Sequence, residues 1–187
     1  MIKAIITDFD GTLVDTFEAN LATYQKVLGD FGVELSREKY RECFGLRFDA
    51  FMTAIGIDDA LMRNHIKEAK TALYPSFFEK LLPNKVLIDF LMTLRASGVK
   101  IAIASTARKE NLMNVLRYLG LEESFDLIMA GVNVSKGKPD PEIYTLTMSQ
   151  LRVSPDDVLI FEDSLVGLLA AEASGAKYIK ITEEFFK

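Results

Sequence analysis

The chain has 187 residues, of which 49% are hydrophobic and 26% charged, and its formal net charge is −5. This length accommodates one well-buried α/β core with a smaller attached unit, but not two full domains of about 150 residues each. The acidic balance and the lack of any run rich in lysine or arginine argue against nucleic acid as the main partner.

The sequence carries no sign of a membrane partner. Its longest charge-free runs, residues 127–135 and 143–151, are much shorter than the ~20 apolar residues that span a bilayer. Cys43 is the only cysteine, which excludes an intrachain disulfide and favours a cytoplasmic location. We expect Cys43 to serve in packing and His65, the only histidine, to lie on the surface.

The outer parts of the sequence alternate between strand and helix. The first apolar run, residues 2–7, ends in Asp-Phe-Asp-Gly, as expected for a buried parallel strand. After a long insertion, Asn84 is placed to cap a helix that ends at Gly98. Further strands are predicted at residues 99–104, 126–129, 158–161 and 178–181, and further helices at residues 110–119, 142–151 and 165–173. This alternation predicts an α/β fold with a parallel sheet of about five strands.

Residues 15–82 interrupt the alternation. Apolar residues recur there at helical spacing, and no convincing strand occurs. The sequence therefore predicts a core formed by residues 1–14 and 83–187 and a helical cap formed by residues 15–82. Residues 11–16 and 82–84 are expected to be the linkers on which this cap moves. Three lysines of the cap are expected on solvated faces: Lys67, Lys70 and Lys80.

Polar side chains follow the first four predicted strands, at the end where open parallel sheets bind ligands. They are Asp8 and Asp10 after the first strand, Ser105 and Thr106 after the second, Lys138 in the loop after the third, and Glu162, Asp163 and Ser164 after the fourth. Each group alone is equally well explained as a solvated strand end or a helix cap. Four crowded carboxylates, however, would repel one another unless a cation lies between them, and oxygen ligands favour Mg²⁺.

Four segments give the sequence a family resemblance. They read DFDGTLVD at residues 8–15, ST at residues 105–106, GKPDP at residues 137–141 and FEDSLVG at residues 161–167. In this order and spacing they resemble the four motifs of the haloacid dehalogenase superfamily, most closely its branch of phosphoglycolate phosphatases and β-phosphoglucomutases. The resemblance covers nearly all of the chain and implies a Rossmann-like core with a helical cap inserted after the first strand.

The resemblance also implies which residues react. Asp8 would attack phosphorus and form an aspartyl-phosphate. Asp10 would protonate the leaving alcohol and then activate water, and an acid at this position favours cleavage of a C–O–P ester over dehalogenation. Lys138 would neutralise the nucleophile and the transferring group.

Other residues are implied to bind phosphate, metal and substrate. Ser105 and the Thr106 backbone would hold phosphate oxygens together with Lys138. Arg47, in a cap loop where relatives place a basic side chain, would select the substrate, although it is equally well explained as a surface arginine. Four residues would hold Mg²⁺, with Glu162 bound directly or through water: Asp8, Asp10 through its carbonyl, Glu162 and Asp163.

Three functions fit these motifs. The first, which we favour, is a Mg²⁺-dependent phosphatase acting on a small phosphorylated metabolite such as a sugar phosphate or phosphoglycolate. The second is a phosphohexomutase similar to β-phosphoglucomutase, which shares every motif but returns the phosphoryl group to sugar. The third is a non-catalytic phosphate-binding protein or a receiver-like module. The intact set of reacting residues weighs against lost catalysis, and the helical insertion weighs against a receiver.

The sequence departs from the family pattern in two places. The second linker reads Leu82-Pro83-Asn84, where many relatives have a proline–glycine pair. The sequence also ends at Lys187, soon after the fifth predicted strand, so we expect one edge of the core to be trimmed.

Overall fold

A parallel sheet of five strands, in the order β5-β4-β1-β6-β7, forms the centre of the first of two units. The computed structural model describes residues 1–186, and contacts divide them into one unit of residues 1–15 and 82 onward and a second unit of residues 16–81. The predicted α/β class and the parallel sheet of five strands are confirmed.

The strands of this sheet are short and mostly buried. β1 (Ala4–Thr7) lies at the centre, between β4 (Lys100–Ala104) and β6 (Val158–Glu162). β5 (Leu127–Met129) lies beyond β4, and β7 (Lys177–Lys180) forms the other edge. The chain builds outward from β1 to β5 and then crosses back to β6, so the direction of winding reverses beside β1. Ligands bind at such a reversal, beyond the carboxyl ends of the strands.

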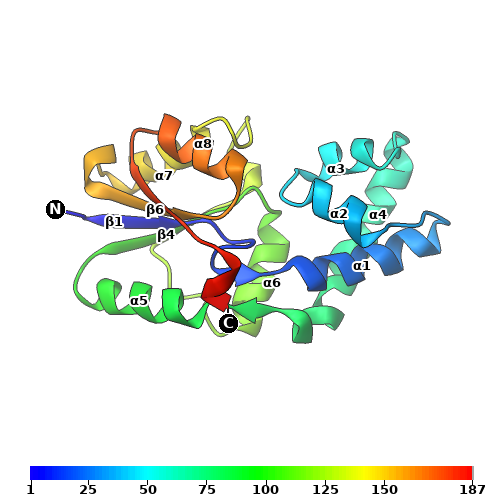
Figure 1. The fold of residues 1–187 in the computed structure, drawn as a ribbon, viewed down its shortest axis with the longest axis horizontal. Coiled ribbons are helices and arrows are strands. Elements are labelled where there is room, and N and C mark those ends of the chain that lie inside the picture. The colour runs from blue at the N-terminus through cyan, green and yellow to red at the C-terminus, as the bar shows by residue number, and fades with distance from the viewer. Residues whose placement is uncertain (187) are drawn as a thin grey trace. The chain divides into compact units, whose positions relative to one another are not determined.

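Helices cover both faces of the sheet (Figure 1). α5 (Lys85–Ala96) and α6 (Lys109–Tyr118) lie on one face, and α7 (Glu142–Leu151) and α8 (Leu165–Ala173) on the other. Side chains alternate along a strand, so Ala4 and Ile6 join Tyr144 of α7 in one buried cluster while Ile5 points to the opposite face. Three short 3₁₀ helices complete this unit: η2 (Gly131–Asn133), η3 (Pro155–Asp157) and η4 (Glu183–Phe186).

The two linkers contain a strand pair that the sequence analysis missed. β2 (Val14–Asp15) pairs antiparallel with β3 (Leu82–Pro83), so the outgoing and returning chain segments are hydrogen-bonded to each other. The predicted cap residue Asn84 is confirmed, because its side chain accepts a hydrogen bond from the Leu87 amide at 3.0 Å. Its amide group also donates to the Thr12 carbonyl at 3.2 Å, which joins the second linker to the loop after β1.

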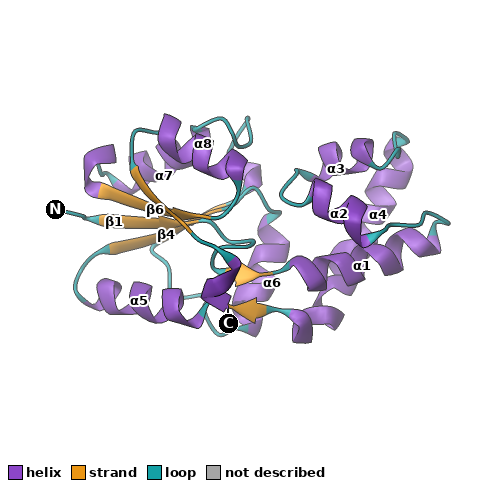
Figure 2. Ribbon diagram, in the orientation of Figure 1, coloured by secondary structure: helices purple, strands orange, loops and turns teal. Residues whose placement is uncertain are grey.

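The second unit is helical, as the spacing of its apolar residues predicts (Figure 2). Its elements are α1 (Phe17–Asp30), α2 (Arg37–Cys43), α3 (Phe48–Ala54), α4 (Ala60–Leu73) and the 3₁₀ helix η1 (Tyr74–Lys80). Its own apolar core includes Cys43, while His65 is exposed, and both expectations are confirmed. The solvated position predicted for Lys70 is wrong: the side chain is buried, and its ammonium lies 3.6 Å from the centre of the Tyr74 ring. The aromatic face and the apolar stem make this burial favourable.

Candidate active site

The carboxyl ends of β1 and β6 bring two acidic segments together. Thr7 pairs with Phe161, so Asp8 at the end of β1 lies beside Glu162, the last residue of β6. The Asp8 amide donates to the Phe161 carbonyl at 2.9 Å, which extends the strand pairing to the aspartate. Both side chains are buried. The parallel register therefore places these two carboxylates next to each other.

Lys138 links the two carboxylates. Its ammonium donates to Asp8 Oδ1 at 2.5 Å and to Glu162 Oε2 at 2.6 Å. The side chains of Lys138, Asp8 and Glu162 are only 6%, 9% and 1% exposed. Burial opposes the charged ammonium, but the neighbouring carboxylates hold the pKa of Lys138 well above its ordinary value. The lysine is therefore a fixed positive charge against Asp8.

Each oxygen of Glu162 is held by its own donors. Oε2 accepts from Lys138 and, at 2.5 Å, from the hydroxyl of Tyr144. Oε1 accepts from the Asp163 amide at 3.2 Å, and from the Ser164 amide and hydroxyl at 3.1 and 2.8 Å. Burial alone would raise the pKa of Glu162, but Lys138 and these hydrogen bonds lower it. Glu162 is therefore held as a carboxylate in one orientation.

Asp163 is oriented by the loop that follows β1. The Thr12 hydroxyl donates to Asp163 Oδ1 at 2.8 Å. Gly11 has a φ of +89°, and a Cβ at this position would overlap the Asp163 carboxylate. Burial and the charge of Glu162 raise the pKa of Asp163 to about 6. Glycine is thus needed at position 11 both for the turn and for the close approach of the carboxylate.

The cluster fits a cation. Among the described residues, oxygens of Asp8, Glu162 and Asp163 lie within 4.8 Å of one another, and these carboxylates are buried or half-buried. Burial raises the pKa of Asp8 well above its ordinary value, and the charges of Glu162 and Asp163 add to this effect. A cation bound between the carboxylates would offset the repulsion among them and lower the pKa of Asp8. An all-oxygen donor set of this kind is suited to a hard divalent ion.

Asp10 lies at the exit from β1. It is half-buried, and its carboxylate is not one of the three in the cluster. The family resemblance implies that Asp10 would meet a metal through its main-chain carbonyl instead. After Asp10 the chain turns sharply, with the Gly11 amide donating to the Val14 carbonyl at 2.8 Å. Asp10 therefore stands at the start of this turn, two residues after Asp8.

Ser105 and Thr106 follow the neighbouring strand. β4 pairs with β1, so its carboxyl end opens at the same edge of the sheet as Asp8. Ser105 is buried, and its hydroxyl accepts from the Ala107 amide at 3.1 Å. Thr106 is half-buried, and its carbonyl lies so close to Gly131 that a Cβ there would overlap it. The strand end is therefore a tight turn that holds these two residues beside the strand carrying Asp8.

One predicted site residue, Arg47, belongs to the second unit. It is half-buried at the N-cap position of α3, and its side chain makes no capping hydrogen bond there. Conversely, the sequence analysis missed Tyr144, which is fully buried on α7 and donates to Glu162. One signal could have found it: a tyrosine on the apolar face of a buried helix needs a partner for its hydroxyl.

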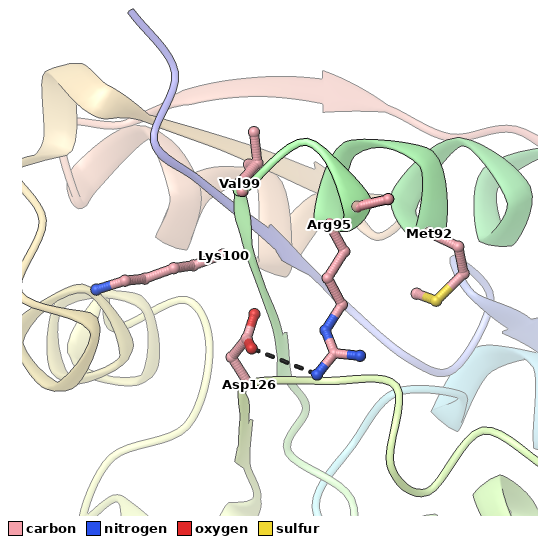
Figure 3. Close-up of a pocket in the computed structure, with 7 residues that line it drawn as sticks. Met92, Arg95, Val99, Lys100 and Asp126 are labelled. Atoms are coloured by element: carbon pink, nitrogen blue, oxygen red, sulfur yellow. Dashed lines mark ion pairs between the residues drawn. The ribbon is translucent and has the colours of Figure 1, made fainter.

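A surface pocket lies at the amino ends of β4 and β5, opposite the carboxyl ends where the acidic residues gather (Figure 3). It is formed where α5 ends and β4 begins, with Lys100 as the first residue of that strand. Its charged groups already have partners: Arg95 pairs with Asp126 at 3.5 Å, and Lys100 donates to the Leu151 carbonyl at 2.7 Å. The residues that line this pocket include none of the three clustered carboxylates.

The fold and the site together define a doubly wound α/β protein. Its buried acidic site, which is suited to a cation, lies where the direction of winding reverses beside β1. The model of the family described as haloacid dehalogenase-like hydrolase matches residues 5–181. The chain belongs to this family, which confirms the prediction drawn from the four motifs.

None of the helices in residues 1–186 is long and apolar enough to cross a membrane.

Named relatives share most of their length with this chain. The chain is similar to the phosphorylated carbohydrates phosphatase of Thermotoga maritima, with 32% identity over 184 residues, which cover 95% of this chain and 84% of that protein. It is 27% identical to the β-phosphoglucomutase of Bacillus subtilis, over 93% of this chain and 80% of that enzyme. The crystal structure of CbbY from Rhodobacter sphaeroides in complex with phosphate superposes with a TM-score of 0.90 at 28% identity, covering 100% of this chain and 89% of that one.

Proposed function

We propose that this chain is a Mg²⁺-dependent phosphatase that hydrolyses small phosphate monoesters through an aspartyl-phosphate on Asp8. The observation that carries the proposal is the buried contact of 2.5 Å between the Lys138 ammonium and Asp8 Oδ1. A carboxylate held against a fixed positive charge at the ligand-binding edge of the sheet is suited to attack an anionic phosphoryl group.

The metal would be held by the acidic cluster. Asp8 and Asp163 would contribute carboxylate oxygens, Asp10 its main-chain carbonyl, and Glu162 an oxygen directly or through water. When bound, Mg²⁺ would supply positive charge that offsets the negative charge of the transferring phosphoryl group. The raised pKa values of Asp8 and Asp163 support this assignment, because burial and the neighbouring carboxylates disfavour their charged forms, and a bound cation would favour those forms.

The reaction divides into two displacements at phosphorus. In the first, an Asp8 oxygen forms a bond to phosphorus while the ester P–O bond breaks, and Asp10 gives its proton to the leaving alcohol. In the second, Asp10 takes a proton from water, the water oxygen bonds to phosphorus, and the bond to Asp8 breaks. Asp8 is regenerated, and one inorganic phosphate leaves for each ester consumed.

Other residues would hold the phosphoryl group during both steps. Ser105 and the Thr106 backbone lie at the end of the strand beside Asp8, where a hydroxyl and an amide can donate to phosphate oxygens. Lys138 would keep its contact with Asp8 and neutralise charge on the transferring group.

The names of the relatives favour small phosphorylated sugars as the first substrates to test. CbbY has also been crystallised with xylulose-1,5-bisphosphate. We propose that the helical unit acts as the cap that selects among such compounds, with Arg47 as the residue to test. Arg47→Ala should raise KM for a preferred sugar phosphate while leaving turnover of p-nitrophenyl phosphate nearly unchanged.

The experiment that tests the proposal removes the nucleophile. Asp8→Asn keeps the size of the side chain but removes its nucleophilic charge, so turnover of p-nitrophenyl phosphate with Mg²⁺ should disappear. The control is Asp156→Asn, which removes an exposed carboxylate and should retain full activity. Circular dichroism should show both variants folded. Turnover retained by folded Asp8→Asn would contradict the aspartyl-phosphate mechanism.

A phosphohexomutase is the second candidate, because a β-phosphoglucomutase is among the relatives. The two functions differ only in whether the phosphoryl group passes to water or back to sugar. Incubation with a hexose phosphate and a catalytic amount of its bisphosphate distinguishes them. Free phosphate indicates the phosphatase, whereas isomerised sugar phosphate without free phosphate indicates the mutase. Neither product, with or without Mg²⁺, would indicate a binding protein.

A further inference from the structure

We propose that Tyr144 is a positioning residue for Lys138: its hydroxyl holds the Glu162 carboxylate so that Oε2 faces the lysine, and this keeps Lys138 against Asp8. The inference rests on the proposed function, since it assigns a residue that supports the same reaction. Tyr144 lies outside the four sequence motifs and would not itself touch the substrate.

The first support is the position of the Tyr144 hydroxyl. The tyrosine is fully buried on α7, and its hydroxyl donates to Glu162 Oε2 at 2.5 Å. Its ring centre lies 5.1 Å from the Lys138 ammonium, so the ring also lines the space in which the lysine sits. Tyr144 therefore contacts both members of the Glu162–Lys138 pair.

The second support is that the two oxygens of Glu162 accept hydrogen bonds from different donors. Oε1 is held by the amides of Asp163 and Ser164 and by the Ser164 hydroxyl. Oε2 accepts from Lys138 and Tyr144. Gly167 lies so close to the carboxyl group that a Cβ there would overlap it. The carboxylate is thus confined, and the tyrosine supplies the second donor on the side that faces the lysine.

The third support is the flexibility of a lysine. Its stem has four carbons and its ammonium can rotate, so a single carboxylate fixes it poorly. Lys138 is held by Asp8 on one side and Glu162 on the other. Asp8 is consumed as the nucleophile in the proposed reaction, so Glu162 must hold the lysine while the bond to phosphorus forms. A carboxylate that is itself fixed by Tyr144 can do this.

The test is Tyr144→Phe, which removes the hydroxyl and keeps the ring. The matched control is Thr147→Val, on the same helix: Thr147 is also buried, but its hydroxyl donates to the Ile143 carbonyl within the helix. We expect kcat for p-nitrophenyl phosphate to fall about ten-fold in Tyr144→Phe. The Mg²⁺ concentration for half-maximal activity should stay within about two-fold of that of the control, because Asp8 and Asp163 are unchanged and Glu162 Oε1 keeps its donors from Asp163 and Ser164.

A second measurement reports on the lysine without any turnover. Acetic anhydride labelling followed by mass spectrometry compares Lys138 with the nearby Lys136, whose side chain is 71% exposed and serves as the internal reference. Relative labelling of Lys138 should be low in the wild type and in Thr147→Val, and several-fold higher in Tyr144→Phe. This measurement keeps the two proposals apart. Wild-type protein without phosphatase activity would refute the proposed function, whereas the labelling of Lys138 tests the positioning role of Tyr144 whether or not the protein is active.

Two results would overturn the inference. One is Lys138 labelling in Tyr144→Phe that equals the control. The other is a fall in kcat that is recovered fully by raising the Mg²⁺ concentration, which would mean that Tyr144 acts on the metal site and not on the lysine.

Discussion

The Thr12 hydroxyl donates to Asp163 Oδ1 at 2.8 Å, which joins the loop after β1 to the segment after β6. Thr12 is fully buried, and Asp163 is one of the three clustered carboxylates. The contact therefore determines which direction an Asp163 oxygen faces when a cation binds. It is also the simplest place to test how the loop supports the metal.

Thr12→Val should weaken metal activation. Valine has the same shape as threonine but cannot donate, so Asp163 loses the bond that orients it. We expect the Mg²⁺ concentration for half-maximal activity to rise about ten-fold, measured by titration of phosphatase activity. Thr93→Val is the control, because the Thr93 hydroxyl bonds to the Asp89 carbonyl within α5. Equal half-saturation in both variants would show that the Thr12 contact does not support the metal.

The acidic cluster should make the metal-free protein less stable as pH rises. The pKa of Asp163 is raised from 3.8 to about 6 in the folded state, so folding takes up a proton between these values. Its stabilising contribution is present below about pH 4 and is lost as pH rises through 6. Asp163→Asn removes the carboxyl group that titrates, so the variant should not lose this stability as pH rises.

In EDTA at pH 8, Asp163→Asn should therefore be more stable than the wild type, by on the order of 1 kcal/mol or ~2–4 °C in Tm. The difference should shrink toward pH 5, and added Mg²⁺ should stabilise only the wild type. Calorimetry in EDTA and in Mg²⁺ measures all three effects. A difference between the two proteins that does not change with pH would contradict the assignment, and Asp156→Asn on the surface serves as the control.

Two glycine-to-alanine changes should have opposite effects. Gly167→Ala on α8 places a methyl group on the Glu162 carboxyl, so we expect a loss of about 1–3 kcal/mol of stability and a strong loss of activity. Gly29→Ala on α1 meets open space, and better helix propensity should add about 0.5–1 kcal/mol. Urea denaturation measures both. Equal stability of the two variants would mean that Glu162 can move away from the added methyl group.

Asn84 should matter for stability through two bonds at once. Asn84→Ala removes the cap of α5 and the donor to the Thr12 carbonyl, so we expect a loss of about 1–3 kcal/mol in urea denaturation. Asn84→Ser keeps an oxygen that can cap the helix and should lose less. An alanine variant as stable as the wild type would show that the pairing of β2 with β3 holds this linker without Asn84.

Much of the site could be predicted because it depends on strand order. The carboxyl ends of neighbouring parallel strands open at one edge, so Asp8 and Glu162 could be placed together before their register was known. The contacts that orient Glu162 could not be predicted in this way. They depend on how α7 packs on the sheet, and Tyr144 reads in the sequence as one more apolar residue of a buried helix.

The sequence by itself determined the α/β class, the helical insertion, the family and the residues at the strand ends, because these follow from local periodicity and from the order of the motifs. Only the tertiary structure decided which donor meets which oxygen of Glu162, that β2 pairs with β3, and that Lys70 is buried against Tyr74. Such contacts join residues far apart in the chain, or turn a charged side chain inward, and no periodic pattern records them.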